Sequence, residues 1–179
     1  MKNIVFCAMS LDGYIADKDG GVAFLDSVEH SPEVGDYGYK EIIGGIDALV
    51  MGRNTYDTVL GFDVDWPYGD KTVLVVTHRD IEIADDIQDR VSSFAGTPEE
   101  IISHLNAMGK ENLYIDGGII IQEFLNENLI DELIITVVPI LIGEGIALFG
   151  PLNNDLKLIT ESSKQFENGI VQLKYKVAK

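Results

Sequence analysis

The chain has 179 residues, of which 46% are apolar and 24% charged, so it can build one sizeable core and is not disordered as a whole. Its 13 Lys and Arg against 30 Asp and Glu give a net charge of −17, which makes nucleic acids and membrane surfaces poor partners. Cys7 is the only cysteine, so an intramolecular disulfide and a multi-thiolate zinc site are excluded, and a free thiol suits the reducing cytoplasm. We therefore expect a single cytoplasmic domain over residues 1–179, with no metal site.

Short apolar runs alternate with helical patterns over the first two thirds of the chain. Continuous apolar runs are typical of strands that are buried on both faces. A helix start is clearest at Thr97, an N-cap residue followed by Glu99 and Glu100, and Gly109 ends that helix. The predicted strands are 4–9, 14–16, 47–51, 72–76, 90–94 and 113–115, and the other predicted helices are 37–43, 54–60 and 119–127.

The last third of the chain contains strands without intervening helices. Asp131–Ile142 is strand-like and very apolar, and the segments 155–161 and 170–177 alternate as in an antiparallel hairpin with its turn at Glu167–Gly169. The order of elements predicts a three-layer α/β fold: a twisted, mainly parallel sheet flanked by helices, with a C-terminal antiparallel hairpin.

Three strand ends carry residues that suit a ligand, and ligands of open α/β sheets bind beyond the carboxyl ends of the strands. The first is Gly52–Thr55. Gly52 permits a tight turn, Asn54 or Thr55 can cap the helix that follows, and the guanidinium of Arg53 suits a phosphate. The alternative is an ordinary turn without a ligand, in which the arginine faces solvent; such a turn would have the same sequence pattern.

The second strand end is Val76–Arg79, where Arg79 can pair with a phosphate. Thr77 and His78 can form hydrogen bonds there or flank a base, although a simple polar exit from the strand is the alternative. Two of the only three arginines thus stand at strand ends of a strongly anionic protein.

The third strand end is Asp116–Ile119. Gly117 and Gly118, between strand and helix, leave helix N–H groups free for a pyrophosphate, with a plain tight turn as the alternative. Together the three ends predict a phosphorylated dinucleotide, and the two arginines favour NADPH over NADH.

Four motifs occur in a characteristic order along nearly the whole chain. They are Ser-Leu-Asp-Gly-Tyr-Ile-Ala at 10–16, Met-Gly-Arg-Asn-Thr-Tyr at 51–56, Tyr-Ile-Asp-Gly-Gly at 114–118 and Pro-Ile-Leu-Ile-Gly-Glu-Gly at 139–145. The set resembles the dihydrofolate reductase-like superfamily, and most closely the reductase domain of the bifunctional riboflavin-biosynthesis deaminase-reductase and its stand-alone relatives. The zinc deaminase half of that enzyme is absent, because the cysteines it needs are absent.

The resemblance implies a dihydrofolate reductase-like fold and hydride transfer from NADPH to a C=N or C=O bond of a pterin- or pyrimidine-like molecule. It also implies the cofactor contacts. These are Gly52, Arg53 and Thr55 (with Asn54) for phosphates, Thr77 and Arg79 (with His78) for the adenosine 2′-phosphate end, Gly117, Gly118 and Ile119 for the pyrophosphate, and the backbone near Ala8 and Ile15 for the nicotinamide amide.

The resemblance also suggests two acidic residues at the substrate. Asp36 stands where the folate enzymes carry their acid, and as that acid its pKa would be raised by burial, whereas its alternative role is to cap the helix beginning at Tyr37. Glu144 is a second candidate for substrate contact.

We therefore predict an NADPH-dependent reductase of a heterocyclic small molecule. The alternatives are a true dihydrofolate reductase and a non-catalytic dinucleotide-binding protein. The resemblance favours a homodimer, and the stretch Leu133–Ile142 is apolar enough either for a subunit contact or for a central strand covered on both faces.

Overall fold

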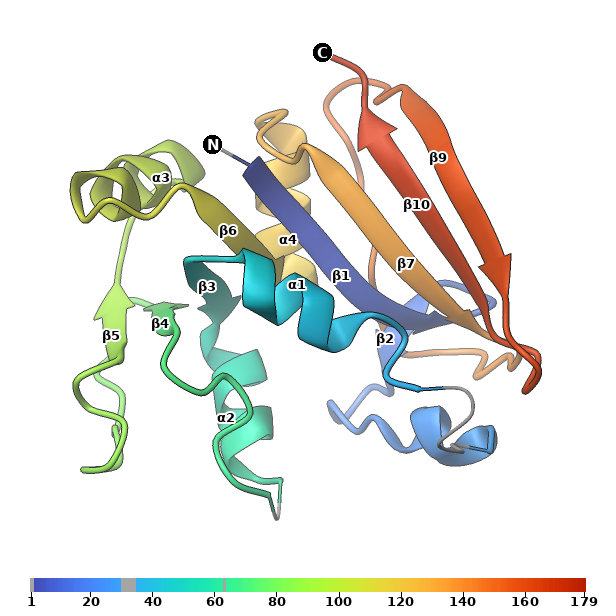
Figure 1. Ribbon diagram of the computed structural model, residues 1–179, viewed down its shortest axis with the longest axis horizontal. Coiled ribbons are helices and arrows are strands. Elements are labelled where there is room, and N and C mark those ends of the chain that lie inside the picture. Colours follow the sequence, from blue (N-terminus) through green and yellow to red (C-terminus); the bar gives the residue numbers. More distant parts are fainter. Residues whose placement is uncertain (1, 30–34, 63) are drawn as a thin grey trace.

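A twisted eight-stranded sheet forms the centre of the protein (Figure 1). The computed structural model describes residues 2–29, 35–62 and 64–179. The strand order is β5-β4-β3-β6-β1-β7-β10-β9, in which the strands from β5 to β7 run parallel and β10 and β9 form the antiparallel hairpin. This is the predicted α/β architecture. The strands of this sheet are β1 (Lys2–Ser10), β3 (Ala48–Gly52), β4 (Thr72–Val76), β5 (Val91–Phe94), β6 (Asn112–Asp116), β7 (Glu132–Val138), β9 (Leu158–Gln165) and β10 (Val171–Val177).

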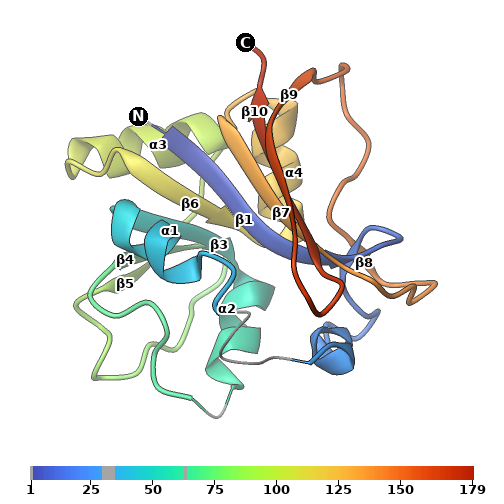
Figure 2. The same ribbon diagram turned by 45° about the vertical axis from the view of Figure 1, so that its right-hand side comes forward.

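Helices cover both faces of the sheet, as a three-layer fold requires (Figure 2). Residues of α3 and α4 join one hydrophobic cluster with alternate residues of β3 and β6, and residues of α1 and α2 join a second cluster on the other face. The helices are α1 (Tyr39–Gly45), α2 (Arg53–Leu60), α3 (Pro98–Ala107) and α4 (Gly118–Asn126). No helix in the described ranges is both long and apolar enough to cross a membrane.

The start of α3 shows how local sequence sets a boundary. The N–H of Glu100 donates to Oγ1 of Thr97, and the N–H of Thr97 donates to the Glu100 carboxylate at 2.8 Å. This reciprocal pair satisfies two N–H groups that the first helical turn leaves free. The cap predicted at Thr97 is confirmed.

The apolar stretch Leu133–Ile142 is a central strand followed by a loop. Its first part lies in β7, which is almost wholly buried between β1 and β10, and Pro139 follows the end of the strand. Burial inside the sheet accounts for the apolar character of the part that lies in β7, whereas Leu141 in the loop is 68% exposed, so a subunit contact through this loop stays a prediction. The homodimer stays a prediction, which sedimentation can test against the monomer mass of 19.7 kDa.

Three short features differ from the prediction. The edge strand β9 spans Leu158–Gln165 rather than 155–161, because all its residues are exposed and no inward-facing pattern marks its ends. The 3-10 helix η1 (Ala23–Ser27) and the strand β8 (Ile146–Ala147), which pairs with β2 (Tyr14–Ala16), are too short to leave a periodic signal.

Candidate active site

Two of the predicted cofactor junctions lie against each other. The strands β3 and β6 are neighbours, with Met51 opposite Asp116, so the turns that follow them also meet. A Cβ atom on Gly117 would stand 2.5 Å from Oγ1 of Thr55 and 3.7 Å from the backbone N of Gly52. The structure thus brings together two turns that are about 60 residues apart in sequence, as a dinucleotide site at this sheet edge requires.

Both helices that begin at this place lack a side-chain cap. The N-cap residues are Gly52 for α2 and Gly117 for α4, and neither can supply a capping oxygen. The prediction that Asn54 or Thr55 caps α2 is therefore wrong, because both lie inside its first turn. Helix N–H groups without side-chain partners, together with the helix dipoles, make this place suitable for a phosphate or pyrophosphate.

The small β2–β8 ribbon closes on the start of α4. A Cβ atom on Gly118 would lie 3.1 Å from Cδ1 of Ile15 and 3.1 Å from the carbonyl oxygen of Ala147. Ile15 therefore adjoins the Gly117–Gly118 turn, and its contact with the nicotinamide amide stays a prediction. Ile119, in the first turn of α4, is 64% exposed and faces solvent.

Strands β1 and β6 separate toward their carboxyl ends. Their pairing ends at Ile4 and Tyr114, although β1 continues to Ser10 and β6 to Asp116. Beyond this point β1 pairs only with β7, where Ala8 lies opposite Thr136. The gap between diverging parallel strands is where open sheets bind ligands, and Ala8 stands on one side of it with Asp116 on the other.

The two candidate arginines belong to neighbouring segments. Arg53 forms an ion pair with Asp57 (Nε to Oδ2, 3.0 Å), and its Nη1 donates to the carbonyl oxygen of Asp80 at 2.8 Å. Arg79, directly before Asp80, has an exposed side chain, and its N–H donates to Oγ1 of Thr77. His78 is also exposed. Arg53 thus lies beside the exit from β4, so a phosphate near both arginines is geometrically reasonable.

Asp36 does not have the environment of a buried acid. Its carboxylate is exposed and accepts hydrogen bonds from the N–H groups of Gly38 and Lys40, both at 3.1 Å. These bonds hold the pKa of Asp36 below its ordinary value. The expected upward shift is therefore wrong. The alternative role is met only in part: α1 begins at Tyr39 rather than Tyr37 and its N-cap residue is Gly38, but the Asp36 carboxylate still holds the N–H of Lys40 in the first turn.

Glu144 lies at the surface, where its Oε1 is 3.3 Å from Nζ of Lys18. It lines an open cavity of about 420 Å³ between the residues around η1 and the loop before β8. Both side chains are more than two thirds exposed, so this pair contributes little to stability.

Asp116 is the acidic residue that the sequence reading did not select. Burial raises its pKa from 3.8 to about 6, against the opposing effect of the Gly117 N–H, which donates to Oδ1 at 2.8 Å. The only signal for Asp116 in the sequence is a carboxyl group directly before Gly-Gly at a strand end, and such a residue is equally typical of a plain turn.

The neighbours of Asp116 are aromatic. Its negative charge adds to the effect of burial in raising the pKa values of Tyr39, Tyr68 and Tyr114, and also that of the Cys7 thiol. Tyr114 donates its hydroxyl to the carbonyl oxygen of Phe6 at 2.7 Å. Such an environment keeps a carboxyl group largely protonated at mildly acidic pH, which is the state that can donate a proton.

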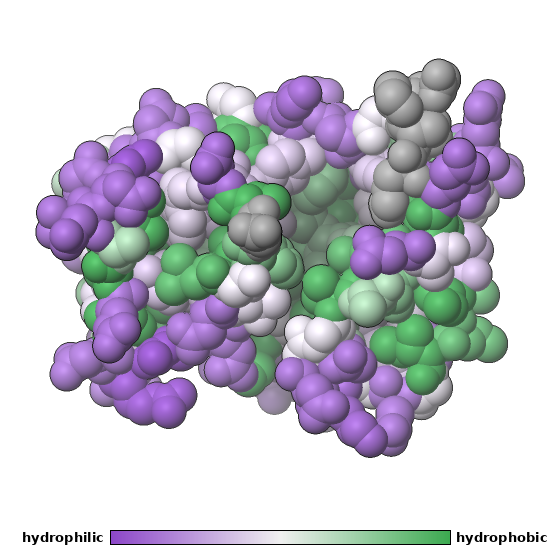
Figure 3. All heavy atoms as spheres, turned by 90° about the horizontal axis from the view of Figure 1, so that it is seen from below, coloured by the Kyte–Doolittle hydropathy of each residue, from purple (hydrophilic) through white to green (hydrophobic). Residues whose placement is uncertain are grey.

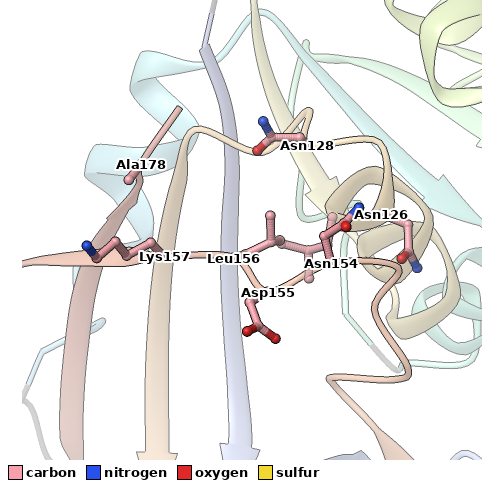
Figure 4. Close-up of a pocket in the computed structure, with 8 residues that line it drawn as sticks. Asn126, Asn128, Asn154, Asp155, Leu156, Lys157 and Ala178 are labelled. Carbon is pink, nitrogen blue, oxygen red and sulfur yellow. The ribbon is translucent and has the colours of Figure 1, made fainter.

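The shape of the molecular surface supports a ligand-binding site on the side where α2, η1 and β2 lie. Seen from below, on the side where α2, η1 and β2 lie in Figure 1, the surface is hollowed near its centre and apolar residues show inside the hollow (Figure 3). A second cavity, of about 270 Å³, lies near the other end of α4 and contains none of the candidate residues (Figure 4). Its lining residues are Leu125, Asn126, Asn128, Asn154, Asp155, Leu156, Lys157 and Ala178.

This arrangement agrees with a comparison of the sequence with known families. Residues 2–172 match the RibD C-terminal domain. The chain belongs to the RibD C-terminal domain family. A crystal structure of a Shewanella sp. PV-4 protein, provisionally assigned to riboflavin biosynthesis, is 46% identical, with a TM-score of 0.93 and full coverage of both chains.

More distant structures share the fold of this RibD C-terminal domain. One is the diaminohydroxyphosphoribosylaminopyrimidine deaminase/5-amino-6-(5-phosphoribosylamino)uracil reductase of Thermotoga maritima, 14% identical with a TM-score of 0.72 over 99% of this chain and 56% of that one. The other is dihydrofolate reductase from Enterococcus faecalis, complexed with NADP(H), 18% identical with a TM-score of 0.66 over 99% and 97% of the two chains. The dihydrofolate reductase-like fold is confirmed.

Proposed function

We propose that this RibD C-terminal domain is an NADPH-dependent reductase that transfers a hydride to a pterin-, pyrimidine- or related heterocyclic molecule. The family and the fold support a reductase. The observation that carries the proposal is the position of Asp116: its half-buried carboxyl group stands directly before the Gly117–Gly118 turn, accepts the Gly117 N–H at 2.8 Å and has a raised pKa.

The residues present fit a dinucleotide. The first turns of α2 and α4, which start side by side without side-chain caps, would hold the pyrophosphate. Arg53 and Arg79 would meet the 2′-phosphate, for which a guanidinium is well suited. Bound in this way, the cofactor would supply the hydride.

Asp116 would supply the proton. Reduction of a C=N or C=O bond needs a proton on nitrogen or oxygen as well as a hydride on carbon. With a pKa of about 6, the carboxyl of Asp116 is protonated in roughly a tenth of molecules at pH 7, far more than an ordinary aspartate, and it lies at the gap between β1 and β6. Asp36, exposed and with a lowered pKa, is poorly suited to this role.

The test compares wild type with Asp116→Asn. NADPH binding is measured by calorimetry, and turnover by absorbance at 340 nm with dihydrofolate, dihydrobiopterin, 5-amino-6-(ribosylamino)uracil and its 5′-phosphate. We expect wild type to oxidise NADPH with at least one of these, and Asp116→Asn to lose about 100-fold or more in turnover with NADPH affinity little changed.

Asp36→Asn is the matched control, because it removes a carboxylate that caps a helix, and turnover should stay within about twofold. Tight NADPH binding without turnover on any compound would support the non-catalytic alternative. Rapid oxidation with dihydrofolate alone would support a true dihydrofolate reductase.

A further inference from the structure

The chain between β8 and β9 begins with a segment that lies along α4. Figure 2 shows this part of the chain at the outer edge of the molecule. Two side chains of α4 hold its backbone: Nε2 of Gln122 donates to the carbonyl oxygen of Ala147 at 3.0 Å, and Nδ2 of Asn126 donates to that of Pro151 at 3.2 Å. Both donors lie on one face of the helix, because they are four residues apart. The segment is therefore attached to α4 at two points along its length.

Four large apolar side chains are exposed along this line. Ile146, Phe149 and Leu152 are 37%, 44% and 42% exposed, although they belong to one short segment. Ile119, in the first turn of α4, is 64% exposed and follows Gly118, whose added Cβ would lie 3.6 Å from Cγ2 of Ile146. Single exposed apolar residues are common, whereas a group of them marks an interaction surface. We call Ile119, Ile146, Phe149 and Leu152 the α4 strip.

The chain around the α4 strip carries no charge. Charged residues make up 24% of the whole chain, but none occurs in residues 117–122 or 145–154. The exposed charged residues that follow these two segments are Glu123 and Asp155. An apolar centre without charges, bordered by polar residues, is the composition of the core and rim of a protein interface.

The acidity of the chain decides which partner suits this strip. A net charge of −17 makes two copies repel each other over most of their surface, and the repulsion is smallest where no carboxylate lies. A basic partner would gain most from the acidic remainder of the surface and little from an uncharged strip. The strip is therefore suited to a partner as acidic as the chain itself.

We propose that the α4 strip is the contact between two copies of this chain. In a twofold arrangement the strip of one copy packs on the strip of the other, so that water is removed from the apolar side chains of both. Glu123 and Asp155 then lie at the rim, where solvent screens their charges. The inference concerns association and does not depend on the proposed reductase function.

The size of the strip predicts a weak dimer. Stable interfaces bury about 800 Å² on each partner and use about 20–30 residues of each, and residues 117–122 and 145–154 supply fewer. We therefore expect a Kd in the micromolar range. Salt should tighten this dimer, because salt screens the repulsion between two acidic molecules and leaves an apolar contact intact. A contact made of ion pairs would instead loosen in salt.

Sedimentation velocity of the full chain, from about 1 to about 200 μM, tests the proposal. The mass of the wild type should rise with concentration from 19.7 kDa toward twice that value. Its Kd should fall by about fivefold or more between about 20 mM and about 500 mM NaCl. A chain that stays monomeric at every concentration, or a dimer that loosens in salt, would overturn the inference.

Charge substitutions then locate the contact. Phe149→Glu places a carboxylate within the strip and should raise the Kd by about 100-fold or more, because the charge is buried without a partner. Met108→Glu is the matched control, since Met108 is 51% exposed at the end of α3 and the variant gains the same charge. Its Kd should stay within about threefold of the wild type.

Two further variants test the rival surfaces. Leu141→Glu changes the loop after β7, and Ile159→Glu changes the exposed edge strand β9. A large rise in Kd for either one, with Phe149→Glu unchanged, would move the contact to that surface and overturn the proposal. Thermal unfolding confirms that each variant is folded, and Leu152→Glu replaces Phe149→Glu if that variant is not.

Discussion

The Oγ1 atom of Thr55 occupies the space that a side chain on Gly117 would need, 2.5 Å from the position of its Cβ. Gly117 also has a φ of +85°, a backbone conformation that side chains rarely adopt. Steric space and backbone conformation therefore both require glycine at the point where the starts of α2 and α4 meet.

Gly117→Ala should lower the free energy of unfolding by about 1–3 kcal/mol and weaken NADPH binding, because the two turns must move apart. Chemical denaturation and calorimetry measure the two effects. Gly109→Ala is the matched control, since Gly109 has a φ of +74° but nothing within 4 Å of its added Cβ. Adding Thr55→Ala to Gly117→Ala should recover part of the stability; no recovery would mean that the contact with Thr55 is unimportant.

Asp116→Asn should stabilise the protein at neutral pH while it lowers turnover by about 100-fold or more. The pKa of Asp116 is about 6 in the folded protein and near 3.8 when unfolded, so the unfolded chain binds fewer protons between these values and stability falls as pH rises through them. Above pH 6 the full cost, about 2–3 kcal/mol, is present. Denaturation at pH 4 and pH 7.5 should show the Asn variant gaining stability over wild type only at the higher pH; a constant difference would contradict the raised pKa.

The activity of the wild type should follow the protonated form of Asp116. Protonated Asp116 falls about tenfold for each pH unit above its pKa, so kcat/KM should decline above about pH 6. Steady-state rates from pH 5 to 9 with a substrate found in the screen test this. Asp36→Asn should leave the profile in place, since Asp36 has a lowered pKa; a profile that moved with Asp36 would return the acid role to that residue.

The sequence was enough to predict the sheet, its flanking helices and the three strand ends, because these follow from local apolar patterns and from glycines at turns. The sequence could not show whether Asp36 or Asp116 is better placed to act as the proton donor. The raised pKa of Asp116 depends on the tertiary fold, which brings its charge near Tyr39, Tyr68 and Tyr114 from three separate segments. A carboxylate that caps α1 and a carboxyl group that acts as a proton donor cannot be told apart in the sequence. They differ only in solvent exposure and in hydrogen-bond partners, which the fold determines.

Arg79→Gln should weaken NADPH binding by about tenfold and leave NADH binding nearly unchanged, because one charge-assisted contact to the 2′-phosphate is lost. The salt dependence of NADPH affinity should fall in the same variant. Arg90→Gln serves as a control with the same loss of charge, since Arg90 is held by Asp89 and two carbonyl groups away from the strand ends. Equal losses in both variants would show a general effect of net charge.

Asp12 ties the turn after β1 to the loop before β8. Its carboxylate accepts hydrogen bonds from Oγ of Ser10 at 2.6 Å and from the N–H groups of Ile142 and Gly143 at 3.3 and 2.8 Å, and these bonds lower its pKa. The stabilisation is therefore present above the ordinary pKa of an aspartate and is lost as pH falls through the lowered value.

Asp12→Ala should consequently increase local opening of the loop, seen as lower hydrogen-exchange protection of the Ile142 and Gly143 amides with little change in the protection of β7. Glu144→Gln is the matched control, because it removes a carboxylate from the same loop that holds no described backbone N–H. Its protection factors should equal those of the wild type. If Asp12→Ala leaves both amides as protected as before, other contacts hold the loop, and Asp12 only shapes its own turn.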